Sequence, residues 1–362
     1  MKSTIEVLNK CTECRLCVNE CSFLTWLGKT PREVSQDLLG TINGLKTYPF
    51  SCFLCGLCKV VCPNKIDVPE MFHEARRALA SKLLSSNTYY KLLLPDEEHF
   101  LAYEYKKRKK ISYENLAPNR YFKYAFFPGC AMSYSSPKAI LVLYDMLNDN
   151  LKDVGIIDLC CGKPIYDLGL TARATRWLIH RVIDRLRGHE CKVVITACPN
   201  CYYYLKHTLT GEFKVVTIYE LLLNELRGRV EDLVLTIHDS CPDRFNGLFA
   251  KLVREILSGC KLIEMEHSKE RTICCGSGGL VSCISPQLTL SLINIRINEA
   301  VRTGAQIMTV YCYNCAISFW SVQPSIEVKH VLNLVLKVED ESEAIKQGEL
   351  TKIALEVAQE LR

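Results

Sequence analysis

The sequence predicts an α/β protein that has a small helical module at its N-terminus and two duplicated α/β domains after it. Two cysteine runs with identical spacing lie within the first 62 residues and indicate a compact metal-binding module. Five cysteines then recur at a nearly constant offset, which indicates a duplicated domain. Short apolar runs alternate with helical periodicity through the same region, and this alternation is typical of parallel sheets with flanking helices.

The composition restricts the class of protein. The chain has 362 residues, enough for two or three domains, and its net charge of +5 is too small to indicate nucleic-acid binding. The N-terminus lacks the apolar segment of a secretion signal, and no run of about 18 apolar residues predicts a membrane span. Disulfide frameworks belong to small secreted domains, so the 21 cysteines indicate metal or redox chemistry in a reducing, cytoplasmic compartment.

The two N-terminal runs, CTECRLCVNEC and CFLCGLCKVVCP, share the spacing C-x-x-C-x-x-C-x-x-x-C. This spacing is that of two-cluster bacterial ferredoxins, in which three thiolates surround one [4Fe-4S] cluster and the fourth reaches the neighbouring cluster. Zinc also binds C-x-x-C pairs, but it has no use for two copies of an eight-thiolate arrangement. We therefore expect two cubane clusters. Their expected ligands are Cys11, Cys14, Cys17 and Cys62 for cluster one, and Cys52, Cys55, Cys58 and Cys21 for cluster two.

The segment between the module and the repeat carries few chemical signals. Residues 68–84 have helical periodicity. The basic run YEYKKRKK at 103–110 predicts a solvated linker or an exposed helix face, and a docking patch for an acidic partner is the alternative. The expected divisions of the chain are the two-cluster module (1–85), a linker (86–120), the first α/β domain (121–230), the second α/β domain (231–340) and a C-terminal helix (341–362).

The register of the cysteines predicts the duplication. Four cysteines recur 114 residues later, and a fifth recurs 111 residues later, as expected if one loop differs by three residues. Generic core packing does not generate such a register, so we expect two copies of one domain. The pairs are Cys160 with Cys274, Cys161 with Cys275, Cys198 with Cys312, Cys201 with Cys315, and Cys130 with Cys241.

The repeated cysteines follow apolar runs, and ligands of parallel α/β sheets bind beyond the carboxyl ends of the strands. Each half is therefore expected to gather its five thiols at one edge of its sheet. Adjacent cysteines, as in CCGKP at 160–164 and CCGSGG at 274–279, can bind neighbouring metal atoms of one cluster. Glycines after them would let the backbone approach a cofactor and donate N–H groups, with a phosphate cradle or a plain turn as alternatives. These glycines are Gly162, Gly276, Gly278 and Gly279.

The repeated pattern of one Cys, then Cys-Cys-Gly, then C-x-x-C resembles the cysteine-rich CCG domain. With the two-cluster module, it makes nearly the whole chain similar to heterodisulfide reductase, in the form of the D subunit, which is a fusion of the C and B subunits. The motifs that carry the resemblance are FFPGC, LCCG, CPNC, HDSC, ICCGSGG and CYNC. The resemblance implies a helical ferredoxin-like module followed by two Rossmann-like α/β CCG domains.

The resemblance also implies cofactors and a substrate. Each complete CCG domain of that family holds a noncubane [4Fe-4S] cluster, and the disulfide of coenzyme M and coenzyme B is cleaved between the two clusters. Ten cysteines would then be both metal ligands and catalytic residues. They are Cys130, Cys160, Cys161, Cys198 and Cys201 in the first domain, and Cys241, Cys274, Cys275, Cys312 and Cys315 in the second.

Some residues depart from the family pattern or lie outside it. Pro242 follows Cys241 where family members often have histidine, which leaves the identity of the substrate open. Cys191, Cys260 and Cys283 belong to neither motif, and we expect small buried side chains at these positions.

His238 and Asp239 lie just before Cys241. They could deliver protons to a nascent thiolate, although a lone histidine at a strand end is more often structural.

Two functions are consistent with these expectations. The first is that of an oxidoreductase subunit, which passes electrons through the cubane clusters to paired CCG clusters that cleave a disulfide. The second is electron transfer alone, in which the chain links a flavin dehydrogenase, of glycerol-3-phosphate, glycolate or lactate type, to a membrane quinone or cytochrome partner. Both need other redox subunits, through which the chain would be peripheral to a membrane. Ten intact CCG cysteines favour the first function, because a relay could tolerate a degenerate half.

Overall fold

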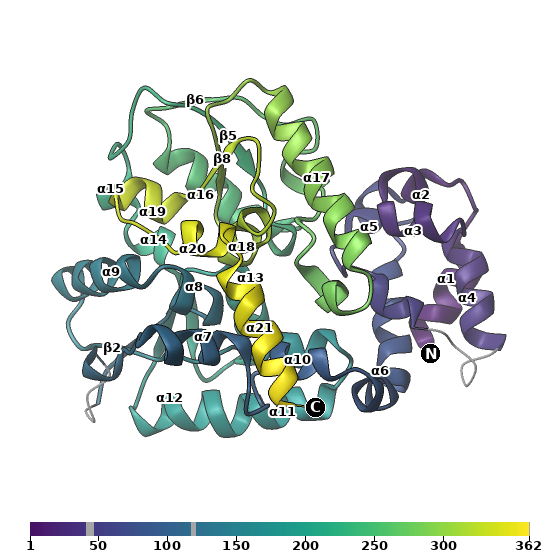
Figure 1. The fold of residues 1–362 in the computed structure, drawn as a ribbon, viewed down its shortest axis with the longest axis horizontal. Helices are drawn as coiled ribbons and strands as arrows, with labels where there is room; N and C mark the ends of the chain where they lie inside the picture. The colour runs from purple at the N-terminus through teal and green to yellow at the C-terminus, as the bar shows by residue number, and fades with distance from the viewer. Residues whose placement is uncertain (41–46, 117–120, 362) are drawn as a thin grey trace.

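The computed structural model describes residues 1–40, 47–116 and 121–361. Parts of the predicted module, linker and C-terminal helix (41–46, 117–120 and 362) lie outside these residues. A helical module lies beside two α/β domains that are stacked on each other (Figure 1). The predicted fold class is confirmed, since parallel sheets follow a helical N-terminal region.

The N-terminal module is helical, and its core lies among the cysteine runs. The longest helix of this module is capped by Asp67, whose side chain accepts a hydrogen bond from the backbone N–H of Glu70. Apolar side chains from several helices pack together, among them Val7, Phe23 and Phe72. The elements are α1 (Lys2–Lys10), α2 (Leu16–Glu20), α3 (Ser22–Leu27), α4 (Pro31–Gly40), η2 (Tyr48–Ser51), α5 (Leu57–Val61) and α6 (Val68–Ser86).

The segment that was expected to be a linker contains regular structure. Its described elements are η3 (Thr88–Leu93), α7 (Leu101–Lys109) and η4 (Glu114–Leu116). Lys106 in the basic run is buried, and its Nζ lies 2.5 Å from a carboxylate oxygen of Asp158. The solvated face expected for this run is therefore found only at residues 107–110, which are exposed.

Each α/β domain contains a four-stranded parallel sheet. The strands are β1 (Tyr124–Phe127), β2 (Val154–Ile156), β3 (Val193–Thr196), β4 (Lys214–Thr217), β5 (Val234–His238), β6 (Lys261–Leu262), β7 (Ile307–Val310) and β8 (Glu327–His330). The strand orders, β2-β1-β3-β4 and β6-β5-β7-β8, are the same once the duplication is taken into account. The order reverses between β1 and β3 and between β5 and β7, the positions at which such sheets bind ligands.

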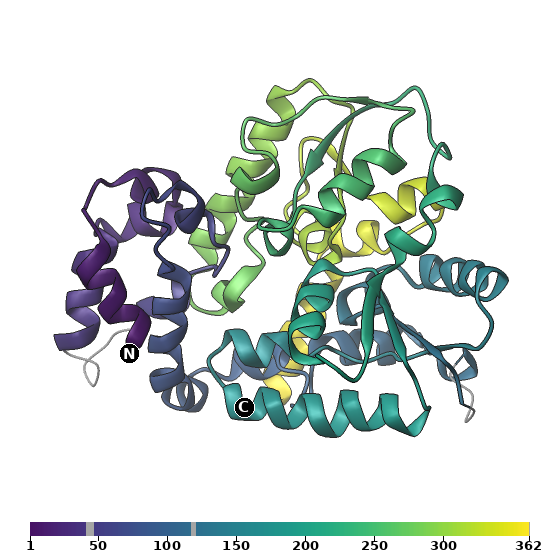
Figure 2. The same ribbon diagram turned by 180° about the vertical axis from the view of Figure 1, so that it is seen from behind.

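Helices flank both sheets, which explains why most strands are apolar on both faces (Figure 2). Proline at the first turn begins several of these helices, where its missing N–H costs little. The first domain has α8 (Cys130–Ser135), α9 (Pro137–Asn150), α10 (Lys163–Asp167), α11 (Thr171–Trp177), η5 (Leu178–Ile183), α12 (Asp184–Gly188), α13 (Pro199–Thr208), α14 (Ile218–Leu221) and α15 (Leu223–Leu226). The second has η6 (Cys241–Asp243), α16 (Leu248–Ile256), η7 (Lys269–Arg271), η8 (Gly278–Cys283), α17 (Pro286–Arg302), α18 (Tyr313–Trp320) and α19 (Val331–Leu336).

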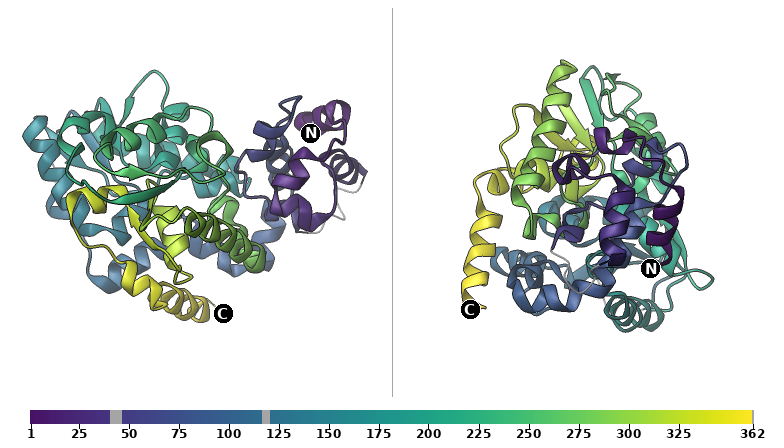
Figure 3. Two further views of the ribbon diagram at one scale, coloured as in Figure 1. Left: turned by 90° about the horizontal axis from the view of Figure 1, so that it is seen from above. Right: turned by 90° about the vertical axis from the view of Figure 1, so that its right-hand side faces the viewer.

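The chain ends in α20 (Ser342–Lys346) and α21 (Glu349–Glu360). Although it follows the second domain, α21 lies against α7 and the first domain, while the module projects from the other side of the pair (Figure 3). The Tyr105 hydroxyl donates to Glu341 at 2.8 Å, and Lys109 pairs with Glu349 at 2.7 Å. The C-terminal segment therefore ties the two domains together.

Candidate metal centres

The module gathers the thiols of its two cysteine runs into two sets. In the first set, the Cys17 thiol at the start of α2 is surrounded by those of Cys11, Cys14 and Cys62. Arg15 adopts a left-handed conformation, with φ of 61°, and bends the chain around this set. Burial and the neighbouring thiols raise the pKa of Cys17 to about 11. These four cysteines are the ones expected to hold cluster one.

In the second set, the buried Cys58 thiol is surrounded by those of Cys21, Cys52 and Cys55. Burial and these neighbours raise the pKa of Cys58 well above its usual value. These are the four cysteines expected to hold cluster two. Cys17 also acts on the pKa of Cys58, so the two sets are neighbours.

The five repeated cysteines of the first α/β domain form one row of contacts. The Cys160 thiol is hydrogen-bonded to Cys130 and Cys161. Cys161 in turn contacts Cys201, and Cys201 contacts Cys198. All five residues follow the carboxyl ends of β1, β2 and β3, as the sequence predicts, and only Cys130 is partly exposed.

The five cysteines of the second α/β domain form a row in the same order. Cys241 is hydrogen-bonded to Cys274, and Cys274 to Cys275. Cys275 contacts Cys315, and Cys315 contacts Cys312. The duplication of the sequence is therefore repeated in the geometry of the thiols.

The two rows meet at Cys198 and Cys312, whose thiols share a hydrogen bond. Asn200, which lies between Cys198 and Cys201, donates from Nδ2 to Sγ of Cys312 at 3.5 Å. Ten thiols thus form one continuous row, with the two vicinal pairs in equivalent positions on either side of the junction.

The second thiol set of the module lies against the second α/β domain. Cys55 is close enough to Cys241 and Cys274 for their charges to act on one another. Arg244 donates from Nε to the carbonyl oxygen of Cys55 at 2.9 Å and from Nη2 to that of Thr272 at 2.6 Å. This arginine fixes the module's cysteine loop to the second thiol row.

A second arginine, Arg76 in α6, is fully buried where all three units meet. Its guanidinium donates to the carbonyl oxygens of Pro49 and Cys52 in the module, Asp167 in the first domain, and Gly279 in the second. Arg76 was not among the predicted residues, because arginines that bind backbone carbonyls have no sequence signature. The helix has two adjacent arginines, and only Arg76 lies on its apolar face, while Arg77 is exposed.

The glycines of the CCGSGG loop allow a close approach between domains. A Cβ atom at Gly278 would lie 2.5 Å from the carbonyl oxygen of Phe53, and one at Gly279 would lie 2.4 Å from that of Cys52. The loop therefore packs directly on the backbone that carries the second thiol set. The other two predicted glycines follow the vicinal cysteines with positive φ: Gly162 (87°) and Gly276 (85°). A role for these four glycines in cofactor binding remains a prediction.

The chemistry of the donor set fits iron–sulfur clusters. The donors are all thiols, and burial keeps most of them protonated unless a cation replaces the protons. Hydrogen bonds from neighbours within the rows lower the pKa of Cys275 to about 6 and that of Cys161 well below its usual value. Soft thiolates select clusters, zinc or copper(I), and five thiols in a row exceed the four that a structural zinc site uses.

His238 lies at the end of β5, next to the second thiol row. Its Nδ1 accepts a hydrogen bond from Nε of Arg296 at 2.9 Å, and a ring nitrogen lies within 4.8 Å of Sγ of Cys275 and of Cys315. Burial and the Arg296 charge lower the pKa of His238 to about 3, so the ring is neutral. The neighbouring Asp239 pairs with Arg254 at 2.8 Å and has a structural role.

The cysteines outside the motifs lie apart from the rows. Cys191 is buried and its thiol donates to the carbonyl oxygen of Val193 at 3.2 Å. Cys260 and Cys283 pack against the core but are only partly buried, which differs from the buried side chains expected there.

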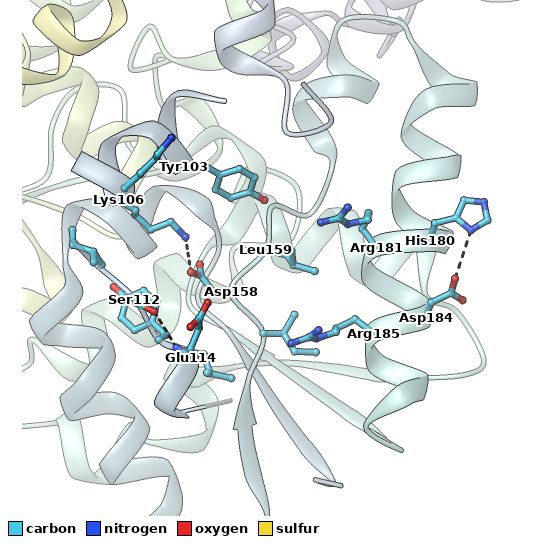
Figure 4. Close-up of a pocket in the computed structure, with 15 residues that line it drawn as sticks. Tyr103, Lys106, Ser112, Glu114, Asp158, Leu159, His180, Arg181, Asp184 and Arg185 are labelled. Atoms are coloured by element: carbon cyan, nitrogen blue, oxygen red, sulfur yellow. Dashed lines mark hydrogen bonds and ion pairs between the residues drawn. The ribbon is translucent and has the colours of Figure 1, made fainter. Parts of the chain in front are cut away.

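A cavity of about 650 Å³ adjoins the first thiol row (Figure 4). It is lined by α7, the end of β2, η5 and α12, and includes Leu159, the residue before Cys160. The guanidinium groups of Arg181 and Arg185 point into it from one wall, opposite Tyr103 (Figure 4). Glu114, Asp158 and Asp184 also line the cavity, so acidic groups of a ligand could be held only next to the two arginines.

Comparison with known protein families identifies the same three units. Residues 10–67 match the 4Fe-4S dicluster domain, and residues 124–206 and 235–319 each match the cysteine-rich CCG domain. The chain is 25% identical to the D subunit of dihydromethanophenazine:CoB–CoM heterodisulfide reductase from Methanosarcina mazei, over 91% of this chain and 93% of the relative. It is 26% identical to the B subunit of fumarate reductase (CoM/CoB) from Methanothermobacter marburgensis, over 86% of this chain and 67% of the relative. It is 28% identical to EtfAB:quinone oxidoreductase of Syntrophomonas wolfei, over 46% and 26%, respectively.

The fold and the thiol sets define an iron–sulfur protein that joins a 4Fe-4S dicluster domain to two cysteine-rich domains. More particularly, the chain is similar to iron–sulfur subunits of heterodisulfide and fumarate reductases, and the predicted likeness to the D subunit of heterodisulfide reductase is confirmed. Among the helices that the structure describes, none is both long and apolar enough to cross a membrane.

Proposed function

We propose that this chain is the subunit of a redox complex that reductively cleaves a small disulfide. The observation that carries this proposal is the contact between Cys198 and Cys312, which joins two five-thiol rows into one. If each row holds a noncubane [4Fe-4S] cluster, the two clusters adjoin at this contact. Two adjoining one-electron centres suit the cleavage of a disulfide, which takes two electrons and two protons and yields two thiols.

The proposed electron path follows the contacts between the thiol sets. Cluster one would lie next to cluster two, since Cys17 is close enough for its charge to raise the pKa of Cys58. Cluster two would lie against the second row, since Cys55 is close enough for its charge to raise the pKa of Cys274. The second row then meets the first at Cys312. Electrons from another protein of the complex would therefore reach the second α/β domain before the first.

The residues of this chain would also place the substrate. The cavity lies at the Cys160 end of the first row, whereas the two rows join at Cys198. A disulfide whose acidic groups were held there by Arg181 and Arg185 would therefore meet the first-row cluster and receive the electrons of both clusters through it. A disulfide such as that of coenzyme M and coenzyme B, named for the Methanosarcina mazei relative, is the first candidate to test. When bound, the clusters would supply the two electrons; the protein holds the clusters, excludes water from the buried thiols and orients the substrate.

A second candidate function is electron transfer without disulfide chemistry. The similarity to EtfAB:quinone oxidoreductase over 184 residues favours it. In that role the same row of centres would relay electrons between a flavin dehydrogenase and a quinone-reactive or cytochrome partner at a membrane.

Anaerobic purification of the full chain, followed by a disulfide assay, separates these functions. We expect about sixteen iron atoms per chain, for four four-iron clusters. After reduction with dithionite and removal of the excess, addition of the heterodisulfide should release two thiols per disulfide consumed. Sixteen iron atoms without thiol release would favour the relay. About eight iron atoms together with zinc would contradict the assignment of clusters to the two rows.

A further inference from the structure

The two α/β domains differ at one pair of buried positions beside their thiol rows. His238 is the last residue of β5. Cys241 and Cys130 are 111 residues apart, and the same offset places His238 opposite Phe127, the last residue of β1. Arg296 is related to Val182 by the offset of 114 residues that applies to the other cysteines. All four side chains are buried. The polar pair is therefore a property of the second domain alone, within this duplicated register.

The contacts of His238 fix which ring nitrogen carries the proton. A guanidinium can only donate hydrogen bonds, and Nε of Arg296 donates to Nδ1 of His238 at 2.9 Å. The neutral ring must then carry its hydrogen on Nε2. Within the part of the chain that the structure describes, Nε2 is buried and has no hydrogen-bond partner. One ring nitrogen lies within 4.8 Å of Sγ of Cys275 and of Cys315. Because Nδ1 is occupied by Arg296, Nε2 is the nitrogen that can donate to a sulfur.

This geometry favours a donor over a metal ligand. A histidine that binds a metal through Nε2 needs the lone pair of that nitrogen, and its proton must then be on Nδ1. A proton on Nδ1 of His238 would oppose the N–H of Arg296. The arginine therefore prevents the tautomer that ligation requires.

Arg296 is itself held by a buried network. Its Nη1 lies 2.6 Å from Glu299, one helical turn further along α17. Glu299 contacts Nδ1 of His267 at 3.1 Å, and Nε2 of His267 lies 3.2 Å from Glu20. Glu20 directly precedes Cys21, an expected ligand of cluster two. The network thus anchors the arginine between the module and the second row.

We propose that His238 donates its Nε2–H to a sulfur atom of the cluster in the second α/β domain, and that Arg296 is the positioning residue that fixes this tautomer. Hydrogen bonds to cluster sulfurs stabilise the more negative, reduced state, so the cluster of the second domain is easier to reduce than that of the first. The inference rests on the proposed clusters in the two rows. It assigns the second domain the role of first electron acceptor from the module.

Two variants of one residue test the donor. His238→Asn keeps an acceptor for Arg296 but is too short to reach the sulfurs, whereas His238→Gln extends an amide N–H to about the position of Nε2. The clusters are titrated with redox mediators and followed by electron paramagnetic resonance in the full chain. The variants are made in a Cys160→Ala background, which removes the first-row cluster. The paramagnetic resonance signal of the second-row cluster is then the only one expected from the two rows. Iron per chain and the thermal unfolding midpoint are measured alongside.

We expect His238→Asn to lower the reduced-to-oxidised ratio of the second-row cluster about tenfold at a fixed potential, which corresponds to about 59 mV for a one-electron couple. His238→Gln should restore most of this shift. Phe127→Leu, in the matching position of the first domain, should leave the second-row signal unchanged. An unchanged potential in His238→Asn with full iron content would overturn the proposal, and so would the loss of about four iron atoms, which would make His238 a ligand. Absence of the cluster from the parent protein would instead contradict the proposed function.

Discussion

Arg244 donates a hydrogen bond from Nε to the backbone carbonyl of Cys55, at 2.9 Å, across the boundary between the dicluster module and the second α/β domain. The two residues are 189 positions apart. If the thiol sets hold clusters, electron transfer between them depends on how closely the protein holds them, and this bond holds the Cys55 loop close to Cys241, the first cysteine of the next row.

Replacement of this arginine should slow electron transfer while leaving the clusters in place. Arg244→Met removes hydrogen bonds to three backbone carbonyls, and each carbonyl left unsatisfied costs about 1–3 kcal/mol. We expect a lower unfolding midpoint and slower reoxidation of the module clusters by disulfide in stopped-flow absorbance. Arg187→Met, which removes an exposed ion pair with Glu212, is the control. Equal rates in both variants would contradict the role given to Arg244.

The close approach at the CCGSGG loop predicts a large effect of a single methyl group. Gly279→Ala would place Cβ 2.4 Å from the carbonyl oxygen of Cys52 at φ of 63°, so the loop and the module must separate. Gly211→Ala has a similarly unfavourable φ of 87° but open space around it. We expect Gly211→Ala to lose about 1 kcal/mol of stability, the cost of the backbone conformation alone, and Gly279→Ala to lose several-fold more. Thermal unfolding of the two variants measures the difference, and equal losses would show that the contact with Cys52 is unimportant.

The junction of the two thiol rows predicts which cysteines hold iron. Cys198→Ala should lose about four iron atoms per chain and all thiol release from a disulfide. Cys191→Ala, seven residues earlier and bonded only to backbone groups among its described contacts, should retain both. Iron analysis of the two anaerobically purified variants provides the measurement. Retention of full iron content by Cys198→Ala would remove this residue from the ligand set.

The cavity beside Cys160 predicts a charge-dependent affinity. Reversing both charges, in Arg181→Glu with Arg185→Glu, should raise KM for an acidic disulfide about tenfold and leave kcat nearly unchanged, because each exposed charge contributes up to about 1 kcal/mol. Added salt should reduce the difference. Arg176→Glu, on an exposed position outside the cavity, is the matched control. Steady-state kinetics with acidic and uncharged disulfides tests this, and an equal effect on both substrates would count against the cavity as the binding site.

The fold class and the grouping of the thiols could be predicted from sequence because both depend on periodic signals. Because Cys160 recurs as Cys274 at the common offset, the two halves were predicted to share one fold. The two sheets do have the same strand order. Ferredoxin spacing likewise predicted that Cys62 would join the set of Cys17, 45 residues away.

The contacts that join the units could not be predicted in the same way. Arg76 and Arg244 bind backbone carbonyls, which every residue possesses, so no partner residue identifies them in the sequence. The contact of Cys198 with Cys312 depends on how the two domains stack, and local patterns contain no information on stacking. Lys106 lay within a basic run that is typical of exposed helices, and its pairing with Asp158 followed only from the tertiary fold.

The return of α21 to the first domain has a consequence for the order of folding. Glu349, at the start of this helix, pairs with Lys109 in α7, and the whole second α/β domain lies between these two residues in the chain. The packing of α21 on α7 can therefore form only after the second domain has been synthesised. Docking of this helix is expected to be a late folding step that follows collapse of both sheets.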